Sequence, residues 1–445
     1  MNKFILCMMA MGWQHPTDAQ NKATGLSRVK LYIDPGHGGT YNTGAHGYSE
    51  SEKVLRVALA LKEYLLNYTD MQEENIMLSR ITDADPNTDL SVRTNEANAF
   101  GAHFFYSIHS DASTNPGVKS TLFLYGGRRL VAGGSVLEKL PEGGKEFGDI
   151  LNANLTGVME VTSRGNQADL NFYCCQTAPS DRLVPYLGVL RGSNMAAHLS
   201  EAGFHTNPEQ NVCNMNDGYR RMQAYAAYQS LVKFLSKKFG EAPVDPVQVG
   251  IATGFIRNFE TGAPVNGATI KLVKDAITKT CTTDTYESLF HKYSKNPDEL
   301  RNGFYWIEGL TPGTVYNATI EAEGFETVQT TLSVPKNIGA TTKDGLGKLD
   351  INLKKKTVVV YEPKPEEIFP HRVYPNPTDG VFTLELADKN KYQVTITDMS
   401  GKTLKRQLIN KKITKIDISS FSDGMYLLKI DNGKKQTVTK IVKKR

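Results

Sequence analysis

Cysteine is scarce in this chain of 445 residues. The chain has five cysteines, and no two of them form a Cys-x-x-Cys pair: Cys7, Cys174, Cys175, Cys213 and Cys281. This spacing argues against a zinc site built from thiolates. A bond between the adjacent Cys174 and Cys175 would be strained. We therefore expect either that one of them pairs with Cys213, if the chain is exported, or that all three are buried thiols.

Long apolar runs and a strong net charge are also lacking. The formal net charge is +5, which does not by itself require a nucleic-acid partner. The longest apolar stretch near the start follows Lys3 and is too short to span a bilayer. We interpret residues 1–20 as a signal peptide, with a basic start, an apolar centre and a cleavage site near Ala19. No later stretch is apolar and long enough for a transmembrane segment.

Two strand-like stretches each end near a histidine. Residues 29–39 read VKLYIDPGHGG, an apolar run that enters a glycine-rich loop with His37. Residues 104–113 read FFYSIHSDAS, with His109 at the end of the run. If the two strands are neighbours, both imidazoles converge at one edge of the sheet, where α/β folds bind ligands. A catalytic zinc site needs three such protein ligands and an open position for water.

The third ligand is expected to be a carboxylate. Glu50 and Glu52 both qualify, because they begin a stretch whose apolar spacing predicts a helix that Ser49 or Ser51 could cap. An acidic residue at a helix N-terminus can also serve only as a partner of the helix dipole. The sequence pattern alone leaves the choice between the two glutamates open.

A further carboxylate, Glu201, ends an apolar run in residues 195–208, MAAHLSEAGFHTNP. At a strand end facing a zinc-bound water, it would act as general base and then as general acid. The alternative is a solvent-facing glutamate. Three other histidines lack a glycine-rich or strand-end context of this quality, and we interpret them as structural: His103, His198 and His205.

These motifs occur in one order, and together they resemble a known family. IDPGHGG, SESEKVLRVALALKEYL, FYSIHSDAS and LSEAGFHTNPEQ are similar to the zinc-dependent N-acetylmuramoyl-L-alanine amidases of the AmiC and CwlV type, over about residues 28–240. The resemblance implies a Zn²⁺ cofactor and hydrolysis of the amide between N-acetylmuramic acid and the L-alanine of the peptidoglycan stem peptide. It implies zinc ligands His37, Glu50 (with Glu52 as the fallback) and His109, and catalysis by Glu201.

Alternating strands and helices in this region predict an α/β catalytic domain with a mainly parallel sheet flanked by helices. We expect a helix over residues 89–100 with Leu90, Val92 and Ala97 inward, and a structural role for Arg93 as the partner of a carboxylate or a carbonyl. Arg164 is interpreted as a surface residue that could meet a stem-peptide carboxylate. Residues 131–144 look too short and too rich in glycine for the inhibitory helix that some relatives insert there.

Two small all-β sandwich domains are expected to follow the catalytic domain. Residues 250–355 loosely resemble carboxypeptidase-regulatory-like or fibronectin-like modules, and we expect a spacer with core aromatics, including Trp306. A Lys/Pro/Glu linker over 356–369 precedes residues 370–445. There YPNPTDG, DMSGK, GMYLLKI and KIVKK resemble the C-terminal sorting domain of type IX secretion systems.

The combined hypothesis is a secreted zinc amidase that acts on peptidoglycan and depends on the type IX secretion machinery. It would pass through the periplasm to the outer-membrane surface or the medium, without a nucleic-acid partner or a transmembrane segment. Two alternatives remain: another zinc peptidase acting on wall peptides, such as a carboxypeptidase, and a non-catalytic protein that binds the cell wall.

Overall fold

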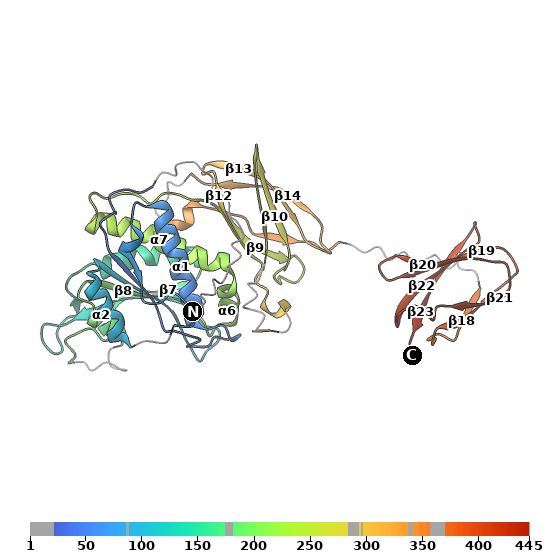
Figure 1. The fold of residues 1–445 in the computed structure, drawn as a ribbon, viewed down its shortest axis with the longest axis horizontal. Coiled ribbons are helices and arrows are strands. Elements are labelled where there is room, and N and C mark those ends of the chain that lie inside the picture. Colours follow the sequence, from blue (N-terminus) through green and yellow to red (C-terminus); the bar gives the residue numbers. More distant parts are fainter. Residues whose placement is uncertain are drawn as a thin grey trace, which may run out of the picture. The chain divides into compact units, whose positions relative to one another are not determined.

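The computed structural model describes residues 22–85, 89–173, 181–283, 293–294, 297–336, 341–356 and 370–444. The predicted signal peptide, nearly all of the predicted linker, and Cys7, Cys174 and Cys175 lie outside these ranges, as does the proposed pairing with Cys213. The chain divides into two compact units, Met1–Lys356 and Thr357–Arg445, which are described one at a time (Figure 1).

A six-stranded sheet forms the centre of the first unit. Its strand order is β2-β1-β3-β8-β4-β7. The strands are β1 (Leu31–Pro35), β2 (Ile76–Leu78), β3 (Phe104–Asp111), β4 (Ser120–Tyr125), β7 (Thr162–Ala168) and β8 (Ala196–Phe204). Neighbouring strands are parallel except for β4 and β8, which run antiparallel. The prediction of a mainly parallel sheet is confirmed, and the carboxyl ends of β1, β3 and β8 meet at one edge.

Helices cover both faces of this sheet. The largest apolar core contains buried residues of α1 (Glu50–Tyr68), α3 (Gly144–Met159) and α7 (Asp217–Phe239) together with residues of β1 and β3. The opposite face packs against α2 (Leu90–Phe100) and α5 (Gly188–Gly192), and the short α4 (Asp169–Phe172) borders it. Helix α6 (Pro208–Met215) follows β8. Within described residues 129–143 there is no helix, only the short strand β6 (Leu137–Glu138), which pairs with β5 (Gly127–Arg128).

The predicted inward face of α2 is wrong in two of its three positions. Leu90 and Val92 are 53% and 42% exposed, whereas Ala97 is buried as expected. Arg93 and Thr94 take the inward positions instead. The reason is electrostatic. Arg93 pairs with the buried carboxylate of Asp34 in β1, so α2 turns Arg93 toward the core and leaves Leu90 and Val92 exposed.

The middle region folds into two β-sheets that share an apolar core. One sheet has the order β11-β10-β13-β14 and the other β12-β9-β15, with β16 also pairing with β9. Their bounds are β9 (Gly250–Asn258), β10 (Thr269–Lys274), β11 (Ile277–Thr282), β12 (Phe304–Leu310), β13 (Thr314–Glu321), β14 (Val328–Val334), β15 (Leu346–Lys348) and β16 (Ile351–Leu353).

This region packs against the amidase-like region within one unit, and its role as a spacer stays a prediction. Ile251, Phe304 and Trp306 belong to the same apolar core as α1 and α7. Trp306 is only 7% exposed, as the prediction of a core aromatic required. The amidase-like and middle regions therefore stabilise each other within one unit.

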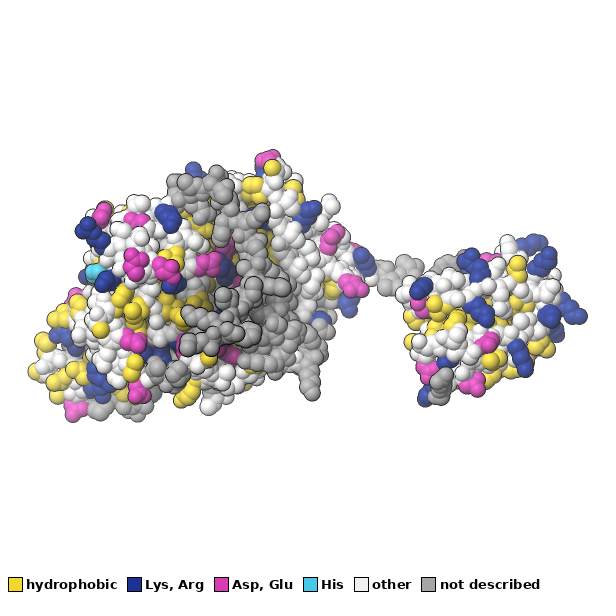
Figure 2. Space-filling model, in the orientation of Figure 1, with side chains coloured by type: hydrophobic (Ala, Val, Ile, Leu, Met, Phe, Trp, Pro, Cys, Tyr) yellow, Lys and Arg dark blue, Asp and Glu magenta, His cyan; other side chains and the backbone are white. Residues whose placement is uncertain are grey.

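The second unit is an all-β sandwich. One sheet has the order β17-β18-β21 and the other β20-β19-β22-β23, with a core between them. The strands are β17 (His371–Tyr374), β18 (Val381–Leu386), β19 (Tyr392–Asp398), β20 (Thr403–Ile409), β21 (Ile413–Asp417), β22 (Gly424–Asp431) and β23 (Gln436–Lys443). Figure 2 shows lysine and arginine side chains spread over the visible face of this unit.

Candidate metal centre and general base

His37 lies in the loop that follows β1, held in a left-handed backbone conformation with φ of 59°. The preceding Gly36 is required by close packing. A Cβ atom on Gly36 would lie 2.2 Å from Cε1 of His109. The glycine therefore lets the two imidazoles approach each other, with ring centroids 5.0 Å apart.

Two buried arginines hold the backbone of this loop. Arg80 donates to the carbonyls of Pro35 (Nε, 3.2 Å) and Gly36 (NH2, 3.0 Å). Arg93 donates to the carbonyls of Pro35 (3.1 Å) and His37 (2.6 Å). The structural role predicted for Arg93 is confirmed. Arg80 was missed, because the acceptors of its guanidinium are backbone carbonyls that leave no pattern in the sequence.

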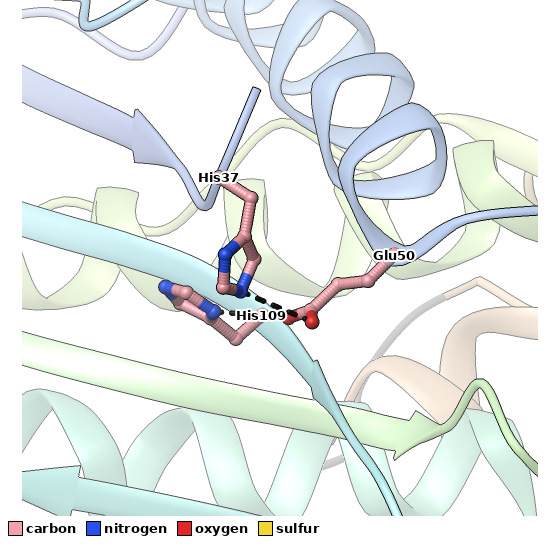
Figure 3. Close-up of side chains that lie close together, drawn as sticks. All are labelled: His37, Glu50 and His109. Carbon is pink, nitrogen blue, oxygen red and sulfur yellow. Dashed lines mark hydrogen bonds and ion pairs between the residues drawn. The ribbon is translucent and has the colours of Figure 1, made fainter. Parts of the chain in front are cut away.

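Glu50 is the first residue of α1, and it points at both histidines (Figure 3). Its Oε1 lies 2.9 Å from His109 Nδ1, and its Oε2 lies 3.1 Å from His37 Nε2. The Ser110 amide donates to Oε1 (2.9 Å) and Asn42 Nδ2 donates to Oε2 (2.7 Å). These four contacts orient a carboxylate that is almost fully buried.

The electrostatics of this cluster favour charged forms. Burial alone would raise the pKa of Glu50, but hydrogen bonds from His109 and His37 hold it well below its usual range. Burial likewise acts to lower the pKa of His109, and the Glu50 carboxylate outweighs it and raises the pKa to about 9. The carboxylate is thus ionised at neutral pH, as a metal ligand must be.

Glu52, the alternative ligand, is occupied elsewhere. Its Oε2 accepts hydrogen bonds from the amide (3.1 Å) and hydroxyl (2.8 Å) of Ser49, which forms a capping box at the start of α1. Its Oε1 accepts from the hydroxyl of Tyr293 in the middle region. Of the two glutamates, the structure brings Glu50 to the histidines.

Glu201 lies on β8 directly opposite His109 of β3 in the strand register. Its Oε2 is buried and has no hydrogen-bond partner among the described residues. Burial raises the pKa of Glu201 to about 8, although the nearby His109 acts to lower it. A carboxyl group with a pKa near neutrality can both accept and donate a proton, and its unpartnered oxygen is available for such an exchange.

Of the other histidines, His205 borders this cluster, whereas His103 and His198 have other surroundings. His205 Nδ1 lies 2.9 Å from the Ser110 carbonyl and 3.9 Å from Glu50 Oε2. His198 is fully buried among aromatic rings, and His103 Nδ1 accepts from the Lys30 amide. Arg164 pairs with Asp111 (2.6 Å) and is about one third exposed.

A pocket of about 300 Å³ opens beside the two histidines. Tyr41 and the exposed Leu90 lie on its border, and the Tyr41 ring stacks on His37 with centroids 5.0 Å apart. Both candidate histidine ligands, His37 and His109, line this pocket.

The donor set fits zinc. One ligand atom each from His37, Glu50 and His109 lies within 4.8 Å of the others. Two imidazole nitrogens and one carboxylate oxygen are the ligands of many catalytic zinc sites, which keep a fourth position for water. The buried, unpartnered oxygen of Glu201 belongs to the adjacent strand, opposite His109 in the register.

Comparison with known proteins identifies two parts of the chain. Residues 31–233 match the family model described as N-acetylmuramoyl-L-alanine amidase. Residues 372–444 match the model of the secretion system C-terminal sorting domain. Among the described residues, no helix is both long and apolar enough to cross a membrane.

Individual relatives agree with the first match. N-acetylmuramoyl-L-alanine amidase CwlM of Bacillus licheniformis is 32% identical over 207 residues, which are 46% of this chain and 65% of that protein. The sporulation-specific N-acetylmuramoyl-L-alanine amidase of Bacillus subtilis is 41% identical over 97 residues, 21% of this chain and 36% of that protein. The chain thus spans less than two thirds of the length of either relative.

Among solved structures, N-acetylmuramoyl-L-alanine amidase from Clostridium difficile 630 is 26% identical, with a TM-score of 0.37. The match covers 49% of this chain and 99% of that one.

Proposed function

We propose, from the match of residues 31–233 to the N-acetylmuramoyl-L-alanine amidase family model, that the chain is a zinc-dependent peptidoglycan hydrolase. It cleaves the amide between the lactyl group of N-acetylmuramic acid and the L-alanine of the stem peptide. The observation that carries the proposal is the convergence of His37, Glu50 and His109 next to Glu201.

In this proposal His37, Glu50 and His109 hold Zn²⁺. When bound, the ion lowers the pKa of a water ligand toward about 7 and polarises the scissile carbonyl. Asn42 and the Ser110 amide keep the Glu50 carboxylate oriented, through bonds of 2.7 and 2.9 Å. Such supporting contacts tune a metal ligand as well as position it.

Glu201 moves the protons of the reaction. Its free oxygen accepts a proton as the water oxygen forms a bond to the amide carbon. The same carboxyl then donates that proton to the alanine nitrogen as the C–N bond breaks, so that the products are a lactyl carboxylic acid and a free amine. Its burial favours the protonated form that the second step needs.

The sorting domain at residues 372–444 implies secretion. We propose that the type IX secretion machinery recognises it, and that the enzyme passes through the periplasm to the outer-membrane surface or the medium. Deleting residues 370–445 should then retain the protein inside the cell, measured by fractionation, without changing its activity on purified wall.

The decisive experiment is digestion of purified peptidoglycan by residues 22–356, followed by mass spectrometry. Free stem peptides that begin with L-alanine are expected, lost with a zinc chelator and regained with zinc. Glu201→Gln should keep its zinc and lose about 100- to 10,000-fold in kcat.

The alternatives predict other products. Release of single terminal amino acids would indicate a wall peptidase. Intact wall that co-sediments with the zinc-loaded protein would indicate a binding protein, and it would remove the role assigned to Glu201.

A further inference from the structure

A β-bulge directly follows Glu201. In the pairing of β3 with β8, His109 lies opposite Glu201 and Asp111 lies opposite Phe204. Two residues of β8, Ala202 and Gly203, therefore oppose a single residue of β3, and Gly203 takes the left-handed conformation with φ of 78°. Bulges of this kind next to active sites re-aim side chains.

The first turn of α1 binds the backbone on both strands at this bulge. Glu50 Oε1 accepts a hydrogen bond from the Ser110 amide of β3 (2.9 Å). Three residues later on the same helix face, Lys53 Nζ donates to the Ala202 carbonyl of β8 (2.9 Å). One acceptor and one donor of α1 thus join the two strands that carry His109 and Glu201.

Lys53 is a buried lysine, which is energetically unfavourable in this position. Lys53 is 1% exposed, and removing an ammonium group from water is strongly unfavourable. Burial lowers the pKa of Lys53 to about 8, while the carboxylates of Glu50 and Glu201 act to raise it. An apolar side chain would fill the same space without this desolvation cost, so packing alone does not explain a lysine at this position.

The two side chains lie on opposite faces of the sheet. Ala202 belongs to the core on the α1 side, whereas Leu199, two residues before Glu201, belongs to the core on the other side. Because side chains alternate along a strand, Glu201 projects to the face of Leu199. Lys53 therefore binds the backbone just after Glu201 from the face opposite to the Glu201 side chain.

We propose that Lys53 is a positioning residue that fixes the bulge after Glu201 and so sets the general base relative to the metal ligand Glu50. This inference rests on the proposed function for its catalytic consequence. Its structural part, that Lys53 holds the Ala202 carbonyl and orders the bulge, stands independently of any activity.

The test compares Lys53→Met and Lys53→Gln with the wild-type full chain. Lys139→Met is a matched control. Lys139 Nζ also donates to the backbone carbonyl of a buried residue, Ser193, but not at the bulge. The measurements are kcat and KM on a soluble muramyl peptide, zinc content, and hydrogen exchange of the amides of Phe204 and His205.

We expect Lys53→Met to lose roughly 10- to 100-fold in kcat, as misplacement of a catalytic group by about 1 Å would cause. KM and zinc content should stay unchanged, and the Phe204 and His205 amides should exchange faster. Lys53→Gln keeps a donor and should recover part of both effects, while Lys139→Met should change neither.

Three results would overturn the proposal: a kcat for Lys53→Met within twofold of wild type, unchanged exchange at the bulge, or loss of zinc, which would place the role of Lys53 at Glu50 instead. If Lys53→Met does not fold, the same criteria apply to Lys53→Gln. If the wild-type chain has no amidase activity, the proposed function fails, and the exchange measurement still decides whether Lys53 orders the bulge.

Discussion

Asp34 and Arg93 form a buried ion pair beneath the His37 loop. Arg93 NH1 lies 2.6 Å from Asp34 Oδ1, and the two side chains are 2% and 1% exposed. The same guanidinium donates to the His37 carbonyl, so the pair connects α2 and β1 to the first candidate ligand. Burial opposes ionisation of Asp34, but Arg93 outweighs it and lowers the pKa of the carboxyl.

Replacing Arg93 with methionine should therefore destabilise the first unit strongly. The change leaves the Asp34 carboxylate buried without its partner, which costs about 3–5 kcal/mol of unfolding free energy. Urea titration followed by Trp306 fluorescence measures this. Arg56→Met is the control, because the Arg56–Asp83 pair is partly exposed and should cost about 1 kcal/mol or less. Equal losses in the two variants would contradict the assignment.

Glu50→Gln and Glu52→Gln should separate the two candidate ligands. In Glu50→Gln the zinc affinity should fall by more than about 100-fold. The reference is the loss of a residue that only supports a metal ligand, which lowers affinity by roughly 10- to 100-fold. Glu52→Gln should keep its zinc and lose about 1 kcal/mol of stability, because the amide has one acceptor oxygen where the carboxylate has two, for Ser49 and Tyr293. Competition with a fluorescent zinc chelator measures the affinity. Zinc loss in Glu52→Gln alone would make Glu52 the ligand.

His198 should make stability depend on pH. Burial among the rings of Phe123 and Phe147 lowers its pKa to about 3, from an ordinary value of 6.5. The unfolded chain thus binds a proton between these values and the folded chain does not. The contribution of His198 to the free energy of unfolding is therefore fully present above about pH 6.5. Between about pH 6.5 and pH 3 it decreases by up to about 1.4 kcal/mol for each pH unit.

The variant His198→Phe should remove this component of the pH dependence. Urea unfolding at pH 7.5 and pH 5 gives the difference for each variant. His46→Phe is the control, because the His46 side chain is only partly buried. If the difference between the two pH values is the same in wild type and His198→Phe, the buried neutral imidazole is not its source.

Glu308 should be essential to the contact between the amidase region and the middle region. Its carboxylate accepts from Arg221 Nε and Trp306 Nε1, both at 2.7 Å, and from the Tyr64 hydroxyl. Glu308→Ala leaves the half-buried Arg221 without this partner and should cost about 3 kcal/mol. Calorimetry of the full chain measures the loss. The exposed Glu321→Ala should stay within about 0.5 kcal/mol of wild type.

The strands and the long helices followed from the sequence itself. Buried parallel strands are almost continuously apolar, so residues 29–39 and 104–113 could be recognised together with the histidines at their ends. The apolar period of α1 and the turn-rich pattern after residue 250 were equally local signals. Each of these depends on neighbours a few positions apart, which a sequence displays directly.

Only the tertiary structure chose between Glu50 and Glu52, two residues apart at one helix start. The choice depends on which serine caps the helix. Ser49 is the N-cap, and its capping box engages the Glu52 carboxylate, so that Glu50 is left to face the histidines. The same holds for α2, whose inward face is decided by a carboxylate 59 positions away. Arg80 and Lys53 left no sequence signal, because their acceptors are backbone carbonyls as far as 149 positions distant. Apolar periodicity predicts where a side chain is buried, but the partner of a buried charge is determined by how distant segments meet.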